Sequence, residues 1–170
     1  MGIIVGEFPE FVVTEQLSDE FTPAKAEFCG KGSTQDLMAL ACRYLVSHKW
    51  CERVERAWLS VDVAPFFIVA VLEFTMRTKA RHRAWVVVGD LPPLHMDDTA
   101  RTWGDALAVY VVLMELWVRR TARGRDVSDL PPVGAPPTDG NRDELSWRCE
   151  EIRKFLRDHG VEVPVVPEDA

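Results

Sequence analysis

The sequence predicts an α+β domain, with an antiparallel sheet of three to five strands and about three helices packed mainly on one face. Two observations lead to this prediction. Two β-prone segments, 66–74 and 84–88, lie at the centre of the chain and are separated by a short polar stretch that suits a hairpin. Helical periodicity occurs once before this pair and twice after it, instead of alternating with single strands.

A single domain is expected to span residues 1–170, because the length suits one domain and the composition is that of a globular chain. Residues 1–30 should form an N-terminal arm or edge strands, since their short β-prone runs are interrupted by glycine and proline. The proline-rich stretch 126–140 should be a connector, and residues 161–170 a tail that forms a last edge strand or an ordered extension.

The first helix should begin near Ser33, a good N-cap residue that is followed three positions later by Asp36. Apolar positions then recur at helical spacing through Tyr44 to His48. We expect the helix to end between Trp50 and Glu55.

The segment 66–74 is long, β-branched and aromatic, which is typical of a central strand that is buried on both faces. Residues 77–83 should be a basic hairpin connection to the antiparallel partner 84–88. We expect this ladder to stop at Gly89-Asp90, because the prolines of Leu91-Pro92-Pro93 have no N–H to donate.

The second helix should start at Thr102 and carry a broad apolar stripe through Tyr110 and Trp117. Arginines fill its last turn, where they complement the helix dipole, and Gly124 suits its C-terminal cap. The third helix should run from about Arg142 to His159.

The net charge is −7 and the pI about 5.1, so a phosphate backbone would be repelled and nucleic-acid binding is disfavoured. No apolar stretch approaches the length that spans a bilayer, and we expect a cytoplasmic protein without a membrane partner. The four cysteines would then be reduced thiols, and they form no C-x-x-C pair. No cofactor and no metal site are expected.

The segment Trp85–Pro93, W-V-V-V-G-D-L-P-P, precedes the amphipathic helix around Tyr110 and Trp117. In this it resembles an uncharacterised bacterial domain family of unknown function, whose members end a strand with a tryptophan-rich V-V-G-D-L-P element ahead of such a helix. The resemblance covers about residues 66–156. It implies a bacterial, cytoplasmic protein and transfers no catalytic residue to this chain.

The segment Asp90–Asp98 is the first candidate site, because a loop between a buried strand and a helix often carries function. Asp90, His95, Asp97 and Asp98 could bind a metal or act as a base and its orienting partner. A structural turn with solvated acids explains the same residues and is the preferred interpretation.

Two further candidates have ordinary explanations. His48 and Cys51 could share a helix face and supply two zinc ligands, yet buried cysteine is common and no other residue has matching spacing. The basic stretch 77–83 could contact phosphate, but a hairpin tip carries such charges for solubility.

Three of the six tryptophans, Trp58, Trp85 and Trp117, fit core positions. The other three, Trp50, Trp103 and Trp147, lie near helix ends or on less apolar faces, where an exposed ring would favour a protein interface. Wrapping the edge of the core would explain them equally well.

Because no catalytic constellation is evident, we expect a small acidic protein-binding module rather than an enzyme. A specific version is an immunity or inhibitor protein that neutralises a basic toxin and uses negative charge to speed association. The alternative is an enzyme or small-ligand-binding domain that uses the loop Asp90–Asp98. A homodimer is a third possibility.

Overall fold

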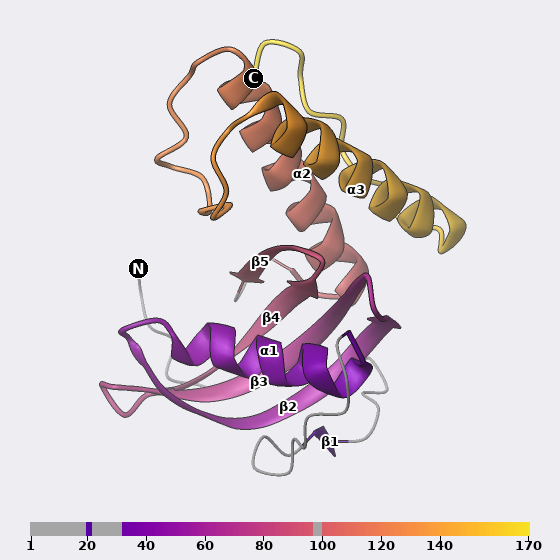
Figure 1. Ribbon diagram of the computed structural model, residues 1–170. Helices are drawn as coiled ribbons and strands as arrows, with labels where there is room; N and C mark the ends of the chain where they lie inside the picture. Colours follow the sequence, from indigo (N-terminus) through magenta and orange to yellow (C-terminus); the bar gives the residue numbers. More distant parts are fainter. Residues whose placement is uncertain (1–19, 22–31, 97–99) are drawn as a thin grey trace. The chain divides into compact units, whose positions relative to one another are not determined.

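The computed structural model describes residues 20–21, 32–96 and 100–170, and the chain divides into two compact units, 1–103 and 104–170. The first unit contains an antiparallel sheet and helix α1, and the second contains α3 and nearly all of α2 (Figure 1). The predicted α+β class, antiparallel sheet and three helices are confirmed. That residues 1–170 form a single domain stays a prediction.

The sheet is a simple antiparallel meander in the order β1-β2-β3-β4-β5. Most of the predicted arm 1–30 lies outside the described residues, apart from two residues of β1 that pair with β2 at Trp58 and Ala57. The strand bounds are β1 Glu20–Phe21, β2 Cys51–Val63, β3 Phe67–Met76, β4 Arg81–Gly89 and β5 Leu91–Met96.

Strand β3 is buried on both faces along nearly its whole length, as its β-branched and aromatic sequence predicted. Its residues with even numbers, from Ile68 to Phe74, belong to the same core cluster as the apolar face of α1. Its residues with odd numbers, from Phe67 to Thr75, lie on the opposite face and are also buried. The long apolar run therefore forms the central strand of the sheet.

Helix α1, Thr34–Val46, lies across one face of the sheet (Figure 1). It begins as predicted, with the Ser33 hydroxyl accepting a hydrogen bond from the Asp36 N–H. The prediction that it ends between Trp50 and Glu55 is wrong. The Ser47 hydroxyl donates to the Tyr44 carbonyl, which supports a turn after Val46, and the chain enters β2 at Cys51.

The prediction that the ladder stops before Leu91-Pro92-Pro93 is also wrong, because Leu91–Met96 forms β5. Gly89 pairs with Leu91, and Val87 pairs with Leu94, so two residues of β5 lie opposite one residue of β4. The two prolines occupy this β-bulge, where ladder hydrogen bonds are missing and proline is tolerated. The candidate segment Asp90–Asp98 is therefore mostly a strand and not a loop.

A network of charges occupies one end of the sheet, on the face opposite α1. Glu73 is buried and accepts hydrogen bonds from Arg81 at 2.6 Å and Arg83 at 3.0 Å. The guanidinium of Arg83 also lies over the Trp58 ring, 5.3 Å from its centroid. The Glu73 carboxylate is thus compensated by two cations where it lies within the sheet.

The second unit is built from α2, Trp103–Ala122, and α3, Asp139–Asp158. Helix α3 begins three residues before the predicted Arg142, because the Thr138 hydroxyl caps it by accepting from the Asn141 N–H. Residues 123–138 form no helix or strand, whereas the last two residues of the predicted connector 126–140 lie in the first turn of α3. The buried stripe of α3 is Leu145, Cys149, Ile152 and Leu156.

Residues 161–170 form no strand, so the expected last edge strand is absent and the ordered extension is observed instead. The turn that leads into this segment is a Schellman motif at the end of α3. Gly160 adopts a φ of 73° and its N–H bonds the Arg157 carbonyl, and the Val161 N–H bonds the Leu156 carbonyl. The extension then runs back toward the C-terminal end of α2 (Figure 1).

The turn between β4 and β5 requires glycine, which gives a first testable prediction. A Cβ atom on Gly89 would lie 2.1 Å from the Phe66 carbonyl oxygen and 2.6 Å from the Phe67 Cα. Gly89→Ala should therefore lower the free energy of unfolding by about 3 kcal/mol, because backbone atoms of β3 would have to move. Chemical denaturation followed by circular dichroism measures this loss.

Gly140→Ala is the matched control, because a Cβ atom there meets nothing within 4 Å and the residue lies in the first turn of α3. This variant should be unchanged or up to about 1 kcal/mol more stable. Equal stability of the Gly89→Ala variant and the wild type would contradict the proposed steric role.

Candidate functional site

The predicted site residues of the segment Asp90–Asp98 do not form one group. Asp90 is exposed in the β4–β5 turn, where its N–H donates to the Phe66 carbonyl at 2.8 Å. His95 lies farther along, in β5, at the position paired with Val86. Asp97 and Asp98 lie outside the described residues. The main chain of Asp90 thus supports the turn, and His95 belongs to a different environment.

The structure brings His95 together with Trp50, two predicted site residues from distant parts of the sequence. Their ring centroids are 5.3 Å apart, and His48 contacts both rings, at 4.8 Å from His95 and 4.9 Å from Trp50. Tyr44 completes the group, with its centroid 4.9 Å from that of His48. We call Tyr44, His48, Trp50 and His95 the four-ring cluster.

Three structural features assemble the four-ring cluster. Tyr44 lies in the last turn of α1, and His48 and Trp50 lie in the turn that follows it. His95 reaches the same place because its partner Val86 belongs to the core cluster under α1, and paired residues share a face of the sheet. All four rings are half-buried, so the cluster closes one end of the α1 core.

Hydrogen bonds fix both histidine rings. The Nδ1 of His48 lies 3.0 Å from the Tyr44 carbonyl oxygen and 3.2 Å from that of Leu45, so this nitrogen carries the proton that it donates. A neutral His48 ring then has its lone pair on Nε2. The Nδ1 of His95 lies 3.0 Å from the Tyr44 hydroxyl oxygen. The Nε2 lone pair of His48 and the Tyr44 hydroxyl are thus held among aromatic rings.

Burial raises the pKa of the Tyr44 hydroxyl to about 12, and a hydrogen bond with the backbone of His95 lowers it in part. The hydroxyl therefore stays protonated at neutral pH and acts as a neutral hydrogen-bonding group. Burial also raises the pKa of the Cys42 thiol to about 11 and raises that of Cys51. These two side chains belong to the hydrophobic core cluster and not to a reactive thiol site.

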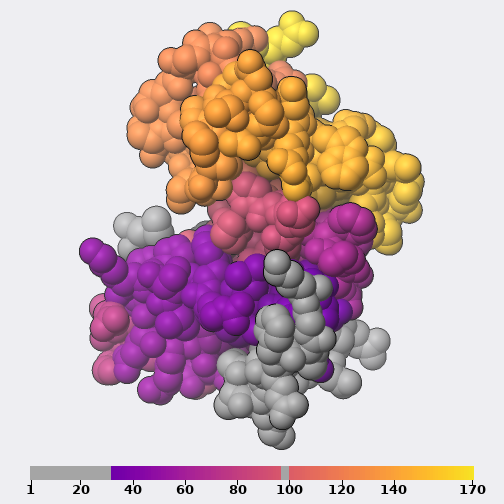
Figure 2. Space-filling model, viewed as in Figure 1, coloured from indigo at the N-terminus to yellow at the C-terminus, as the bar shows by residue number. Residues whose placement is uncertain are grey.

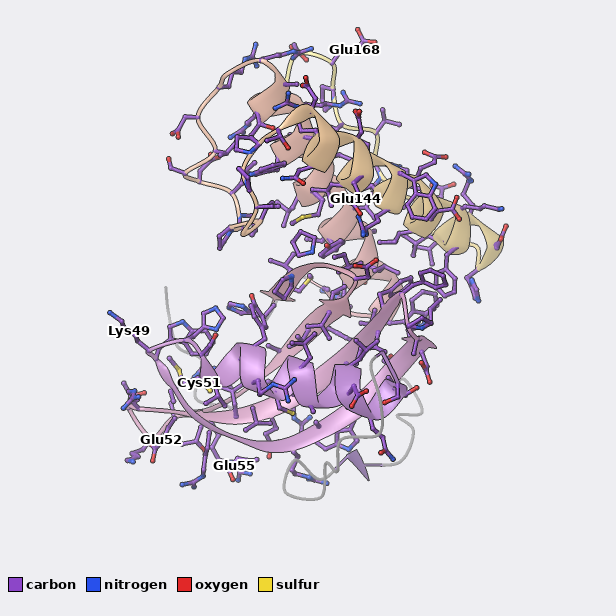
Figure 3. The ribbon with its side chains drawn as sticks, in the orientation of Figure 1. Lys49, Cys51, Glu52, Glu55, Glu144 and Glu168 are labelled. Carbon is purple, nitrogen blue, oxygen red and sulfur yellow. The ribbon has the colours of Figure 1, made fainter. Side chains whose placement is uncertain are left out.

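The possible pair of zinc ligands, His48 and Cys51, does not develop into a metal site in the described residues. Cys51 is the first residue of β2, close in the chain to Lys49 and Glu52 (Figure 3), and its thiol is buried in the core. Within the described ranges, no three His, Cys, Asp or Glu side chains are grouped so that they could hold a metal ion.

The six tryptophans differ strongly in exposure. Trp85 and Trp117 are buried as predicted, whereas Trp58 is half-buried beneath the guanidinium groups of Arg56 and Arg83. Trp50 and Trp103 are half-buried. Trp147 is 58% exposed, so one of the three tryptophans named as possible interface residues is clearly available to a partner.

Trp147 lies on the side of α3 opposite to its buried stripe. It is two residues from both Leu145 and Cys149, which is about 200° around the helix in each direction. The exposed acids Asp143, Glu144, Glu150 and Glu151 are three or four residues away and so neighbour it on the same face. We call Trp147 with these four acids the outward face of α3.

The charges on this face are only partly neutralised. Arg148 pairs with Glu144 at 2.8 Å, and Arg157 approaches Glu150 at 3.7 Å. Lys154, seven residues after Trp147, adds one exposed cation near the end of the same face. Helix α3 lies at the surface of its unit, in orange in Figure 2, and Glu144 extends from it in Figure 3. The face therefore combines an exposed aromatic ring with a surplus of carboxylates.

Of the predicted hairpin connection 77–83, residues 77–80 form the turn and residues 81–83 already belong to β4. The cations of this stretch are engaged by their own unit. Arg77 donates to the Lys49 carbonyl at 2.6 Å, and Lys79 pairs with Glu52 at 2.7 Å. Arg81 and Arg83 pair with Glu73, as described above. These contacts give the hairpin cations a structural role.

Comparison with protein-family models, curated proteins and solved structures finds no match to this chain. The resemblance of Trp85–Pro93 to an uncharacterised bacterial family accordingly stays a prediction. Among the described helices, none combines the length and the apolar character needed to cross a bilayer.

The environment of Tyr44 predicts the alkaline behaviour of the protein. Of the two tyrosines, Tyr44 has a pKa raised to about 12, and burial raises that of Tyr110 as well. Little tyrosinate should therefore be present in the folded protein at pH 10, where an unperturbed tyrosine is half ionised. A spectrophotometric pH titration measures tyrosinate directly.

Because the folded pKa of Tyr44 lies above the unfolded value, its contribution to stability is complete below pH 10 and is lost as the pH rises toward 12. The Tyr44→Phe variant serves as the control, since Tyr110 is then the only tyrosine that contributes to the signal. Half ionisation of the tyrosines near pH 10 with the circular dichroism unchanged would contradict this prediction.

Proposed function

We propose that the protein is a protein-binding module that engages a basic partner through the outward face of α3. The observation that carries this proposal is the exposure of Trp147 in the middle of a regular helix, opposite to its buried stripe. Packing within the unit gives no reason for a large aromatic ring at that position. Tryptophan is, however, among the residues that contribute most binding energy at protein interfaces.

The surrounding charge favours a basic partner. Four carboxylates lie within one helical turn of Trp147, two of them near Arg148 and Arg157, and the whole chain carries a net charge of −7. A basic surface would be attracted over a long range and would associate faster at low salt. The arrangement of an apolar anchor and a charged rim is the usual anatomy of a small interface.

A narrower form of the proposal is an immunity or inhibitor protein that neutralises a basic toxin. Small size, acidity and the outward face of α3 support this form, since such inhibitors use negative charge to capture cationic partners quickly. The narrower form adds one requirement, namely that the partner has a toxic activity that binding abolishes.

The proposal is tested in two steps. The partner is first identified by cross-linking from position 151, and the effect of a substitution at position 147 on the binding affinity is then measured. A photoreactive amino acid in place of Glu151 should cross-link the partner, because this residue is exposed one turn from Trp147. With the partner purified, Trp147→Ala should cost about 2 kcal/mol of binding free energy, or about 30-fold in Kd. Ser146→Ala, exposed on the same helix but about 100° away, should leave the Kd unchanged.

Charge variants separate the anchor from its rim. Replacing Glu150 and Glu151 by glutamine should mainly lower the association rate and its dependence on salt, while the dissociation rate changes little. Unchanged affinity in the Trp147→Ala variant, with normal circular dichroism, would overturn the proposal. So would a cross-linked partner whose contact surface is acidic.

A second candidate function is favoured by the four-ring cluster, which gathers His95, the Nε2 lone pair of His48 and the Tyr44 hydroxyl. These groups would suit a small planar ligand or an acid–base step. Of the residues named for the alternative of an enzyme or ligand-binding domain at Asp90–Asp98, the four-ring cluster includes only His95. Native mass spectrometry of the purified protein should then show a bound small molecule that the His95→Ala variant loses while keeping its fold. A bare mass for both proteins would exclude a tightly bound ligand there.

A further inference from the structure

The segment after α3, residues 161–170, packs on the rest of the second unit through hydrogen bonds from arginine side chains to its main-chain carbonyl oxygens. Arg119 donates from Nη1 to the carbonyl oxygens of Val166 at 2.7 Å and Pro167 at 2.9 Å. Val166 itself is buried, with 3% exposed, although its neighbour Val165 is 81% exposed. One buried side chain and one arginine thus fix the middle of the segment.

A second arginine, on α3, holds the beginning of the same segment. Arg153 donates to the carbonyl oxygens of Val163 at 3.3 Å and Pro164 at 2.9 Å. Its guanidinium also forms a two-point ion pair with Glu115 of α2, at 2.6 and 2.7 Å. Because Glu115 holds the guanidinium in place, the two carbonyl contacts are made by a side chain that is already oriented.

The end of the segment continues the pattern. Arg125 donates to the Asp169 carbonyl at 2.8 Å, and Arg123 lies 3.5 Å from the Ala170 carbonyl oxygen. Arg119 and Arg123, which together with Arg120 were expected to complement the dipole of α2, reach this extended segment with their side chains, and so does Arg125. These four arginines and the site of Val166 make up what we call the tail site.

The contacts at the tail site are of a kind that any extended peptide can make. The hydrogen bonds of the four arginines to the segment reach main-chain carbonyl oxygens, and the recognition of side chains is concentrated on one buried valine. A groove that binds an extended main chain and one side-chain anchor is a common form of peptide recognition.

We propose that the tail site is a peptide-binding site that residues 161–170 fill within one chain, and that the same segment of a second copy can fill it between chains. A second copy is the fitting occupant, because it offers every contact that the structure shows. The single covalent connection from α3 to the segment is the turn at Gly160, so an exchange between chains would require a change of conformation only at this turn. This inference is independent of the partner proposed for Trp147.

The covalent connection determines how the exchange would be observed. A segment tethered by a short turn has an effective concentration of about 1 mM at its own site, so exchange between intact chains should be rare in dilute solution. A free peptide with the sequence of residues 161–170 is therefore the appropriate probe. It is added to a chain whose own segment has been released from the tail site.

Val166→Asp in the full chain should release the segment, because a carboxylate would replace the buried valine. This variant should bind a fluorescently labelled 161–170 peptide saturably and at least about tenfold more tightly than the wild type, whose site is occupied. Val165→Asp, which changes the exposed neighbouring valine, should behave as the wild type does. Fluorescence anisotropy measures all three affinities.

A second variant can test the proposal if the Val166→Asp variant does not fold. A protease recognition sequence inserted between Gly160 and Val161 preserves every contact residue and is cut after folding. The cut segment should stay bound at high protein concentration and exchange with the labelled peptide. Loss of the cut segment without any peptide binding would overturn the proposal, as would equal binding of the peptide by the wild type and the Val166→Asp variant.

Discussion

The first unit depends on the burial of β3 on both of its faces. Because this strand has no polar face to turn toward water, each of its faces must be covered, and its neighbours β2 and β4 must pair along its length. The α1 side is covered by the buried stripe of that helix. The position of β5 and of the four-ring cluster follows, since the register from β3 through β4 places His95 on the α1 face.

The second unit uses another principle. Its two helices carry a buried stripe each, but much of the remaining order comes from arginine side chains that donate to carbonyl oxygens and carboxylates. Arginine is suited to this role because its planar group offers several donors in fixed directions. Arg153 shows the result most clearly, since one guanidinium joins α2, α3 and the segment that follows them.

Features that depend on the local residue pattern could be predicted from the sequence. Features that depend on how the strands pair could not. The central strand and the Ser33 cap are encoded by neighbouring residues, and both were predicted. Strand β5 was missed because Pro92-Pro93 argues against a ladder unless a bulge falls opposite Val88, and a bulge depends on register. The end of α1 was missed because His48 continues the helical spacing while its ring bonds the last carbonyls instead.

The same distinction explains the candidate sites. Tyr44 and His48 are four residues apart, so their contact could be read from a helix, but their contact with His95 depends on β-pairing across the whole sheet. The acids around Trp147, by contrast, follow directly from the helical spacing of three and four residues and could have been recognised from the sequence.

The outward face of α3 and the tail site differ in what already occupies them. The tail site is already filled by Val166 of the same chain, so any partner must displace the tethered segment 161–170. Trp147 has no comparable cover in the described structure, and its ring meets water over more than half of its surface. An apolar anchor that is left open in this way gains more from a partner than one that is already covered. That difference makes the outward face of α3 the stronger candidate for recognising another protein, and the tail site the stronger candidate for exchange between copies.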